Sequence, residues 1–159
     1  ESGFVDEVKL LLDTHGLPPT AITFEVTETM LVDDPDRTAE RLRALKALGV
    51  HLAIDDYGAG NAAINFLLTF PIDVVKFDRN LIAALDERPT PTEALIRSIT
   101  SLAHSLHLET VAEGIEEPEQ LAHVQALGCT KAQGYHLARP MFPDRAERYL
   151  LAHTGMAQR

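Results

Sequence analysis

Five short apolar runs alternate along the chain with segments of helical periodicity. The apolar runs lie at 22–28, 52–58, 74–79, 110–116 and 132–137. Apolar positions recur at three- and four-residue intervals in other segments, at 4–15, 35–48, 93–106, 118–128 and 144–152. Strands that alternate with helices in this way indicate an α/β fold built on a parallel sheet.

Helix start and stop residues support this division. Asp34 and Pro35 stand where an N-cap and a first helical residue belong, and Gly49 follows the end of the same helix. The segments 45–55 and 124–134 both pass from a helix through Leu-Gly into an apolar run. Because glycine lets the chain leave a helix in a left-handed conformation, each segment is typical of stacked βα units.

Polar residues stand at the ends of the apolar runs, where a buried parallel strand should carry mainly Val, Ile, Leu and Ala. They are Glu25, Asp55, Asp56, Lys76, Asp78, Glu113 and Gln133. A shared active site explains them, because the carboxyl ends of parallel strands meet at the active-site end of a barrel or at the crevice of a doubly wound sheet.

The barrel is the better of these two interpretations. No glycine-rich dinucleotide fingerprint follows any of the runs, so we favour a (β/α)8 TIM-like barrel over a doubly wound sheet. A complete barrel takes about 250 residues. The 159 residues of this chain are therefore expected to provide its later five strands and their helices.

The carboxylates predict divalent metal ions. Several carboxylates gathered in a low-dielectric pocket would each cost several kcal/mol unless protons or cations neutralised them. Asp55 and Asp56 could supply a bridging and a terminal ligand to a metal pair about 3.5–4 Å apart. Adjacent residues of a regular strand point to opposite faces, so this requires the strand end to turn both toward the ions. A structural alternative is that the pair caps a turn.

Two interpretations of Lys76 remain open. Lys76 lies in an apolar run, and a salt bridge to Asp78, two residues on and on the same face, would neutralise it. Alternatively, Lys76 orients a metal-bound water or accepts its proton. Glu113 lies between small residues that leave space for a ligand, whereas Glu28 could simply cap the following helix.

Composition excludes several classes of function. The formal net charge of −10 argues against a protein that holds long nucleic acid, whereas a small anion bridged by metal ions remains compatible. The seven histidines are dispersed without cysteine partners, which argues against zinc. Cys129 is the single cysteine and is expected to be structural. No leader or membrane-spanning apolar stretch is recognisable, so a cytoplasmic location is expected.

Taken together, the motifs resemble those of the EAL-domain family of bacterial cyclic di-GMP phosphodiesterases. The matching segments are FEVTET (24–29), IDDYGAG (54–60), FPIDVVKFDRNLI (70–82), VAEGIE (111–116) and GCTKAQGYHLARPM (128–141). The resemblance implies that 1–159 is the C-terminal portion of a single EAL domain. It also implies hydrolysis of cyclic di-GMP to the linear dinucleotide with two Mg²⁺ or Mn²⁺ ions, and a homodimer.

The resemblance assigns roles to individual residues. It makes Glu25 a ligand of the first metal, Asp55 a bridge between both metals, and Asp56 and Glu113 ligands of the second. It gives Lys76 and Gln133 the positioning of the attacking water and the phosphate, and gives Glu28 the tethering of the loop 57–66, which couples dimer contacts to metal binding. Substrate contacts are implied for Asp78, Gln133 and Pro140.

The chain also departs from the family pattern. The Glu-Ala-Leu strand and the next strand, whose asparagine completes the first metal shell, are absent from this sequence. Tyr57, Ala59 and 61–63 replace the Phe, Thr and Tyr-Ser-Ser of many active members. We therefore expect the isolated chain to be catalytically weak. A degenerate domain that binds cyclic di-GMP or a protein without hydrolysis is an alternative, and a metal-dependent lyase or racemase with Lys76 as base is a third.

Overall fold

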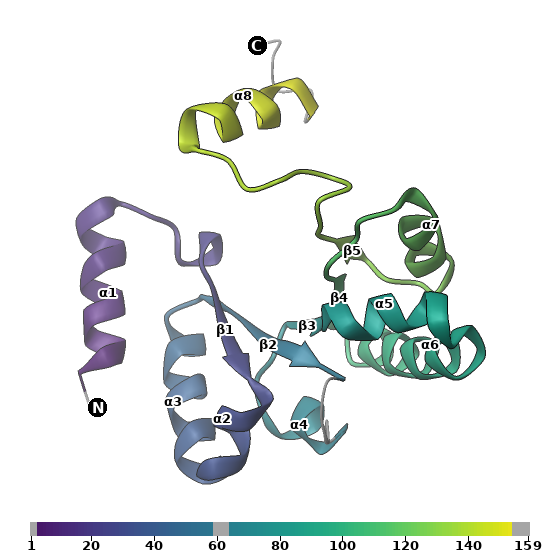
Figure 1. Ribbon diagram of the computed structural model, residues 1–159. Helices are drawn as coiled ribbons and strands as arrows, with labels where there is room; N and C mark the ends of the chain where they lie inside the picture. Colours follow the sequence, from purple (N-terminus) through teal and green to yellow (C-terminus); the bar gives the residue numbers. More distant parts are fainter. Residues whose placement is uncertain (1–2, 59–63, 154–159) are drawn as a thin grey trace.

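A five-stranded parallel sheet forms the centre of the computed structural model, which describes residues 3–58 and 64–153 and, within them, every side chain except those of Glu28, Val32 and Asp33. The strands are β1 (Thr23–Thr27), β2 (His51–Tyr57), β3 (Val74–Phe77), β4 (Glu109–Ala112) and β5 (Lys131–Ala132). Their order in the sheet is their order in the chain (Figure 1). A doubly wound sheet reverses its order at a switch point, so this succession is that of a TIM-like barrel.

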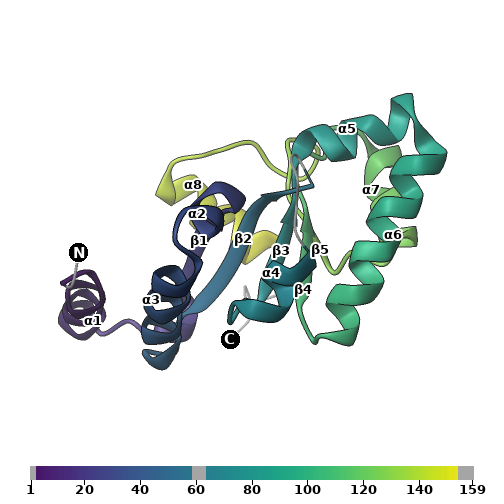
Figure 2. The same ribbon diagram turned by 90° about the horizontal axis from the view of Figure 1, so that it is seen from below.

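Helices precede, connect and follow the strands. They are α1 (Phe4–His15), α2 (Glu28–Asp33), α3 (Pro35–Ala47), α4 (Ile64–Thr69), α5 (Arg79–Glu87), α6 (Pro89–Ser105), α7 (Pro118–Ala126) and α8 (Pro143–His153), with a 3₁₀ turn at Pro19–Ala21. Figures 1 and 2 show α3 and α6 beside the sheet, and Figure 1 shows α8 apart from it after a long connection. None of the helices described is long and apolar enough to cross a membrane.

The predicted α/β alternation is confirmed, with corrections at the strand ends. All five helical segments are helices, but α2, α4 and α5 were not predicted from the periodicity. The strand predicted at 132–137 was wrong beyond Ala132, because the next residues form a turn in which His136 donates its backbone N–H to the Ile115 carbonyl. The runs at 74–79 and 110–116 likewise leave the sheet after Phe77 and Ala112.

The two faces of the sheet differ in polarity. Ile54, Val75, Phe77 and Ala112 point to one face, are 0% exposed and belong to the hydrophobic core with side chains such as Ile96 of α6. The opposite face carries the intervening residues of each strand, because side chains alternate along a strand. The helices thus cover a mainly apolar face, and the charged residues Glu25, Asp55, Lys76 and Glu113 lie on the face that a barrel encloses.

An ion pair fastens the amino-terminal ends of the strands. The Lys46 ammonium, in the last turn of α3, donates to the Asp73 carboxylate at 2.6 and 2.7 Å. Asp73 also accepts the backbone N–H of Leu52 at 2.8 Å. This contact ties α3, β2 and the start of β3 together at the end of the sheet opposite to the polar strand ends.

Substitution of Gly134 tests how closely the turn that follows β5 packs against Ile115. A Cβ at Gly134 would overlap the backbone N, C and O atoms of Ile115, and backbone cannot move aside as a flexible side chain can. We predict that Gly134→Ala lowers the free energy of unfolding by about 2–3 kcal/mol, measured by urea denaturation. Gly3→Ala is the control, because a Cβ at Gly3 meets nothing within 4 Å. Equal stability of the two variants would contradict this packing.

Candidate metal centre around Lys76

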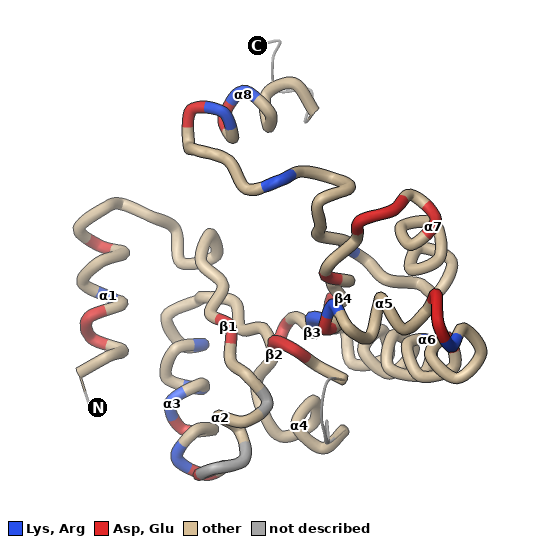
Figure 3. Tube along the Cα trace, in the orientation of Figure 1, with Lys and Arg blue, Asp and Glu red and all other residues tan. Residues whose placement is uncertain are grey.

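Lys76 lies at the centre of a cluster of carboxylates. Its ammonium nitrogen is 2.6 Å from Glu25 Oε1, 2.8 Å from Asp55 Oδ1 and 2.8 Å from Glu113 Oε1. An ammonium has three N–H donors, so these three contacts use all of them. Figure 3 shows acidic segments on β1 and β2 and around β3 and β4, with a basic segment among them.

The cluster is sheltered from water to different degrees. The side chain of Lys76 is 9% exposed, that of Glu113 19% and that of Glu25 48%. Burial acts to lower the pKa of Lys76, but the hydrogen bonds that its ammonium donates to Asp55, Glu113 and Glu25 outweigh it and raise that pKa above its ordinary value. Lys76 is therefore a fixed cation at physiological pH.

Strand order and register bring these residues together. Glu25 pairs with Ala53, which pairs with Val74, and Lys76 pairs with Val111. Residues two apart share a face, so Asp55, Lys76 and Glu113 project from the same side of the sheet as Glu25. The lysine on the middle strand is flanked by carboxylates from both sides.

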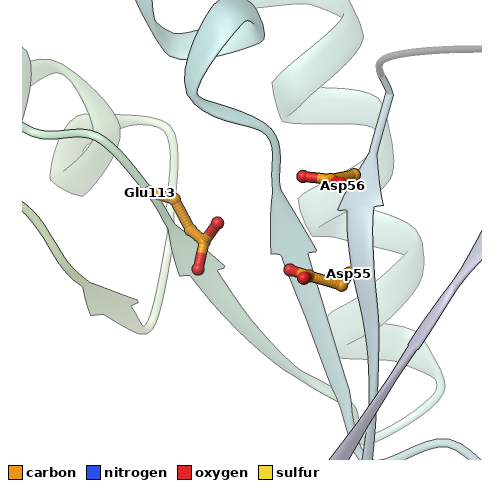
Figure 4. A group of neighbouring side chains, drawn as sticks. All are labelled: Asp55, Asp56 and Glu113. Atoms are coloured by element: carbon orange, nitrogen blue, oxygen red, sulfur yellow. The ribbon is translucent and has the colours of Figure 1, made fainter.

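Asp56 joins this face through an irregularity of β2. A regular strand would point Asp56 to the opposite face from Asp55, but the pairing of β2 with β3 shifts register between Ile54 and Tyr57. Asp56 has a φ of 54°, in the left-handed region that aspartate tolerates better than most residues. Figure 4 shows the carboxylates of Asp55 and Asp56 both directed toward Glu113. Both aspartates therefore face the cluster, as the metal interpretation requires.

Asp55, Asp56 and Glu113 can each offer one oxygen to a common ion. These three oxygens all lie within 4.8 Å of one another. Asp56 is exposed, but partial desolvation, followed by repulsion from the Asp55 and Asp78 carboxylates, raises its pKa, and Lys76 offsets only part of this. Hard oxygen donors of this kind suit Mg²⁺, Mn²⁺ or Ca²⁺, so the donor set fits a divalent cation.

Asp78 has a structural partner. Its carboxylate accepts the backbone N–H of Asn80 at 2.8 Å and caps α5, and its side chain is buried. Within the described part of the chain, Lys76 makes its ion pairs with Glu25, Asp55 and Glu113 and not with Asp78. The salt bridge considered from the sequence is therefore not formed, and contact of Asp78 with substrate stays a prediction.

Gln133 lies next to the cluster rather than in it, and Pro140 shares a cavity with Gln133. The Gln133 N–H donates to the Ala112 carbonyl at 2.8 Å, directly before Glu113. Gln133 and Pro140 line a cavity of ≈ 340 Å³ together with Tyr149 of α8. In the ranges 3–58 and 64–153, no hydrogen bond joins the Gln133 side chain to the carboxylates around Lys76. Their assigned roles at the phosphate and substrate stay predictions.

Other expectations lie outside what is described. The Glu28 side chain and residues 59–63 of the loop 57–66 are not described. The tethering role of Glu28, the effect of the loop substitutions and the homodimer therefore stay predictions. What the sequence reasoning missed is the triple pairing of Lys76, which depends on the register of β2, β3 and β4.

Comparison with known proteins decides the family. The model of the EAL domain matches residues 1–140. The chain belongs to the EAL domain family. The cyclic di-GMP phosphodiesterase RocR of Pseudomonas aeruginosa is 39% identical over 136 residues, 86% of this chain and 34% of RocR. This EAL chain therefore spans about a third of the length of that curated relative.

Solved EAL-domain structures share the fold. The PaMucR phosphodiesterase in complex with c-di-GMP matches with a TM-score of 0.85 at 35% identity, covering 92% of this chain and 59% of that one. The manganese and cy-diGMP complex of BlrP1 from Klebsiella pneumoniae matches with a TM-score of 0.76 at 33% identity, covering 85% of this chain and 35% of that one. These likenesses confirm the TIM-like barrel class.

Replacing Asp55 or its neighbour Asp56 by asparagine should change the stability of the protein in opposite directions. Because the pKa of Asp56 is raised on folding, its ionised form destabilises the metal-free protein as the pH rises above the ordinary aspartate range. Asp56→Asn should therefore raise the thermal midpoint in EDTA at pH 7, and this gain should vanish at a pH well below the ordinary aspartate pKa. Asp55→Asn removes a carboxylate from Lys76 and should cost about 1–3 kcal/mol. Shifts of the same sign would contradict the assigned environments.

Proposed function

We propose that the protein containing this chain is a metal-dependent phosphodiesterase that hydrolyses cyclic di-GMP to the linear dinucleotide. The observation that carries the proposal is the convergence of Glu25, Asp55, Asp56 and Glu113 around Lys76 at the carboxyl ends of the strands. Further support comes from RocR, which is named as a cyclic di-GMP phosphodiesterase. In that protein this chain would be the C-terminal portion of one EAL domain.

The carboxylates would hold two divalent ions. Asp55, Asp56 and Glu113, whose oxygens lie within 4.8 Å of one another, would share one ion. Glu25 reaches the cluster from the β1 side, through the ammonium that also binds Asp55, and would belong with Asp55 to the second. Bound Mg²⁺ or Mn²⁺ would activate water and neutralise phosphate oxygens, as in other two-metal sites. Manganese in the BlrP1 complex is consistent with this donor set.

The remaining residues would position the reactants. Lys76 lies among Glu25, Asp55 and Glu113, so its ammonium would orient the attacking oxygen or the phosphate by hydrogen bonding. Gln133 is held beside Glu113 by the backbone contact to Ala112 and would bind the phosphate. Asp78 and Pro140 would contact the nucleotide from the loops after β3 and β5.

Glu113→Gln tests this function in the full-length protein. Replacing a ligand carboxylate by a neutral isostere should reduce release of the linear dinucleotide, measured by chromatography with Mg²⁺ or Mn²⁺, by about 100-fold or more. Glu109→Gln is the matched control: Glu109 begins the same strand and pairs with exposed Lys131 at 2.6 Å, away from the cluster. We expect near-wild-type turnover in this control.

The non-catalytic alternative has a distinct outcome. A full-length protein that binds cyclic di-GMP by calorimetry without metal, and releases no linear dinucleotide with either Mg²⁺ or Mn²⁺, would be a receptor and not a hydrolase. Turnover by the wild-type protein that Glu113→Gln leaves unchanged would contradict the proposed ligand set. Metal-dependent turnover that is lost in Glu113→Gln but kept in Glu109→Gln would support it.

A further inference from the structure

The ammonium of Lys76 takes up oxygens that the proposed metal ions would need. Three of the four proposed metal ligands, Glu25, Asp55 and Glu113, each give one carboxylate oxygen to Lys76 Nζ, at 2.6–2.8 Å. Asp56 is the fourth, and it lies on the same side through the irregularity of β2. The lysine therefore occupies the electrostatic centre of the metal-free cluster.

The position of Lys76 is fixed by its surroundings. Its stem leaves the middle of β3, whose neighbours Val75 and Phe77 are 0% exposed, and its side chain is 9% exposed. The ammonium cannot leave for water without giving up three short ion pairs. A buried cation held this way acts on every other cation that enters the cluster, because the low local dielectric strengthens their repulsion.

We infer that Lys76 is a built-in counter-ion that weakens divalent-metal binding to the cluster and thereby sets its metal affinity. This inference rests on the proposed function and deepens it. In the metal-free protein the ammonium neutralises part of the charge of the carboxylates and keeps them together. A divalent ion binding to the same carboxylates must do so against the positive charge of Lys76 and must compete for its oxygens.

The sign of the effect follows from two contributions. Without Lys76 the carboxylates repel one another in the metal-free state, which makes that state less stable and favours any incoming cation. The ion also no longer meets a positive charge within a few ångströms. Without Lys76 the carboxylate side chains are also less ordered before the ion binds, which acts in the opposite direction. Ordering two or three side chains costs less free energy, however, than the repulsion between a divalent ion and an ammonium at an effective dielectric constant of about 20.

Mn²⁺ binding to lysine variants tests the inference without measuring activity. We expect Lys76→Met in the full-length protein to bind Mn²⁺ at least about tenfold more tightly than wild type by calorimetry or electron paramagnetic resonance. We also expect a lower thermal midpoint in EDTA and a larger rise on adding Mn²⁺. Lys76→Gln, which keeps hydrogen-bond donors without charge, should behave in the same way and serves if Lys76→Met does not fold.

Two control variants separate charge from general damage. Lys46→Met breaks the ion pair with Asp73 at the opposite ends of the strands, so it should lower the thermal midpoint and leave Mn²⁺ affinity unchanged. Lys76→Arg keeps the positive charge and should not bind Mn²⁺ more tightly than wild type. Tighter binding in Lys76→Arg as well would mean that side-chain shape rather than charge sets the affinity, which would overturn the inference.

The failure of this inference is distinguishable from failure of the proposed function. Mn²⁺ binding by Lys76→Met and Lys76→Gln that is equal to or weaker than that of wild type would overturn the counter-ion role. The hydrolase proposal would still be supported by Mn²⁺ binding to the wild-type protein. If wild type and all variants bound no Mn²⁺ at millimolar concentration, both proposals would be wrong. Tighter binding confined to the two neutral variants would support the counter-ion role.

Discussion

Mutual repulsion between carboxylates is the constraint on which the rest of the structure depends. Glu25, Asp55 and Glu113 share one end of the sheet, and in the metal-free protein Lys76 offsets their repulsion by donating to each of them. The raised pKa of Asp56 reflects the repulsion that remains, because the single ammonium cannot neutralise every carboxylate around it. A cluster with this excess of negative charge is a poor structural core and a good cation site.

The fold produces this cluster through two simple rules of β structure. Parallel strands in chain order place β1, β2, β3 and β4 side by side, and the alternation of side chains directs Ile54, Val75, Phe77 and Ala112 to the helix-covered face and the charged residues of the cluster to the other. One irregularity is added, the left-handed Asp56, which brings a second aspartate of the same strand to the polar face. The chemistry therefore depends on backbone geometry as much as on residue type.

The sequence predicted the alternation of strands and helices, and the residues that converge, because polar side chains in apolar runs are conspicuous. It did not predict α5, because Asp78 was interpreted as the end of a strand and is the N-cap of that helix. The strand predicted at 132–137 was too long. Its early end depends on the close approach of Gly134 to Ile115, a tertiary contact that leaves no periodic pattern in the sequence. The partners of Lys76 also depend on strand register, which one sequence does not specify.

The most direct test of the central claim is anomalous diffraction from crystals of this protein soaked in Mn²⁺. The account predicts anomalous density between the carboxylates of Asp55, Asp56 and Glu113, with the contacts of Lys76 lengthened relative to the metal-free crystal. Density confined to other surface carboxylates, with Lys76 still bound to Glu25, Asp55 and Glu113 at saturating Mn²⁺, would contradict it.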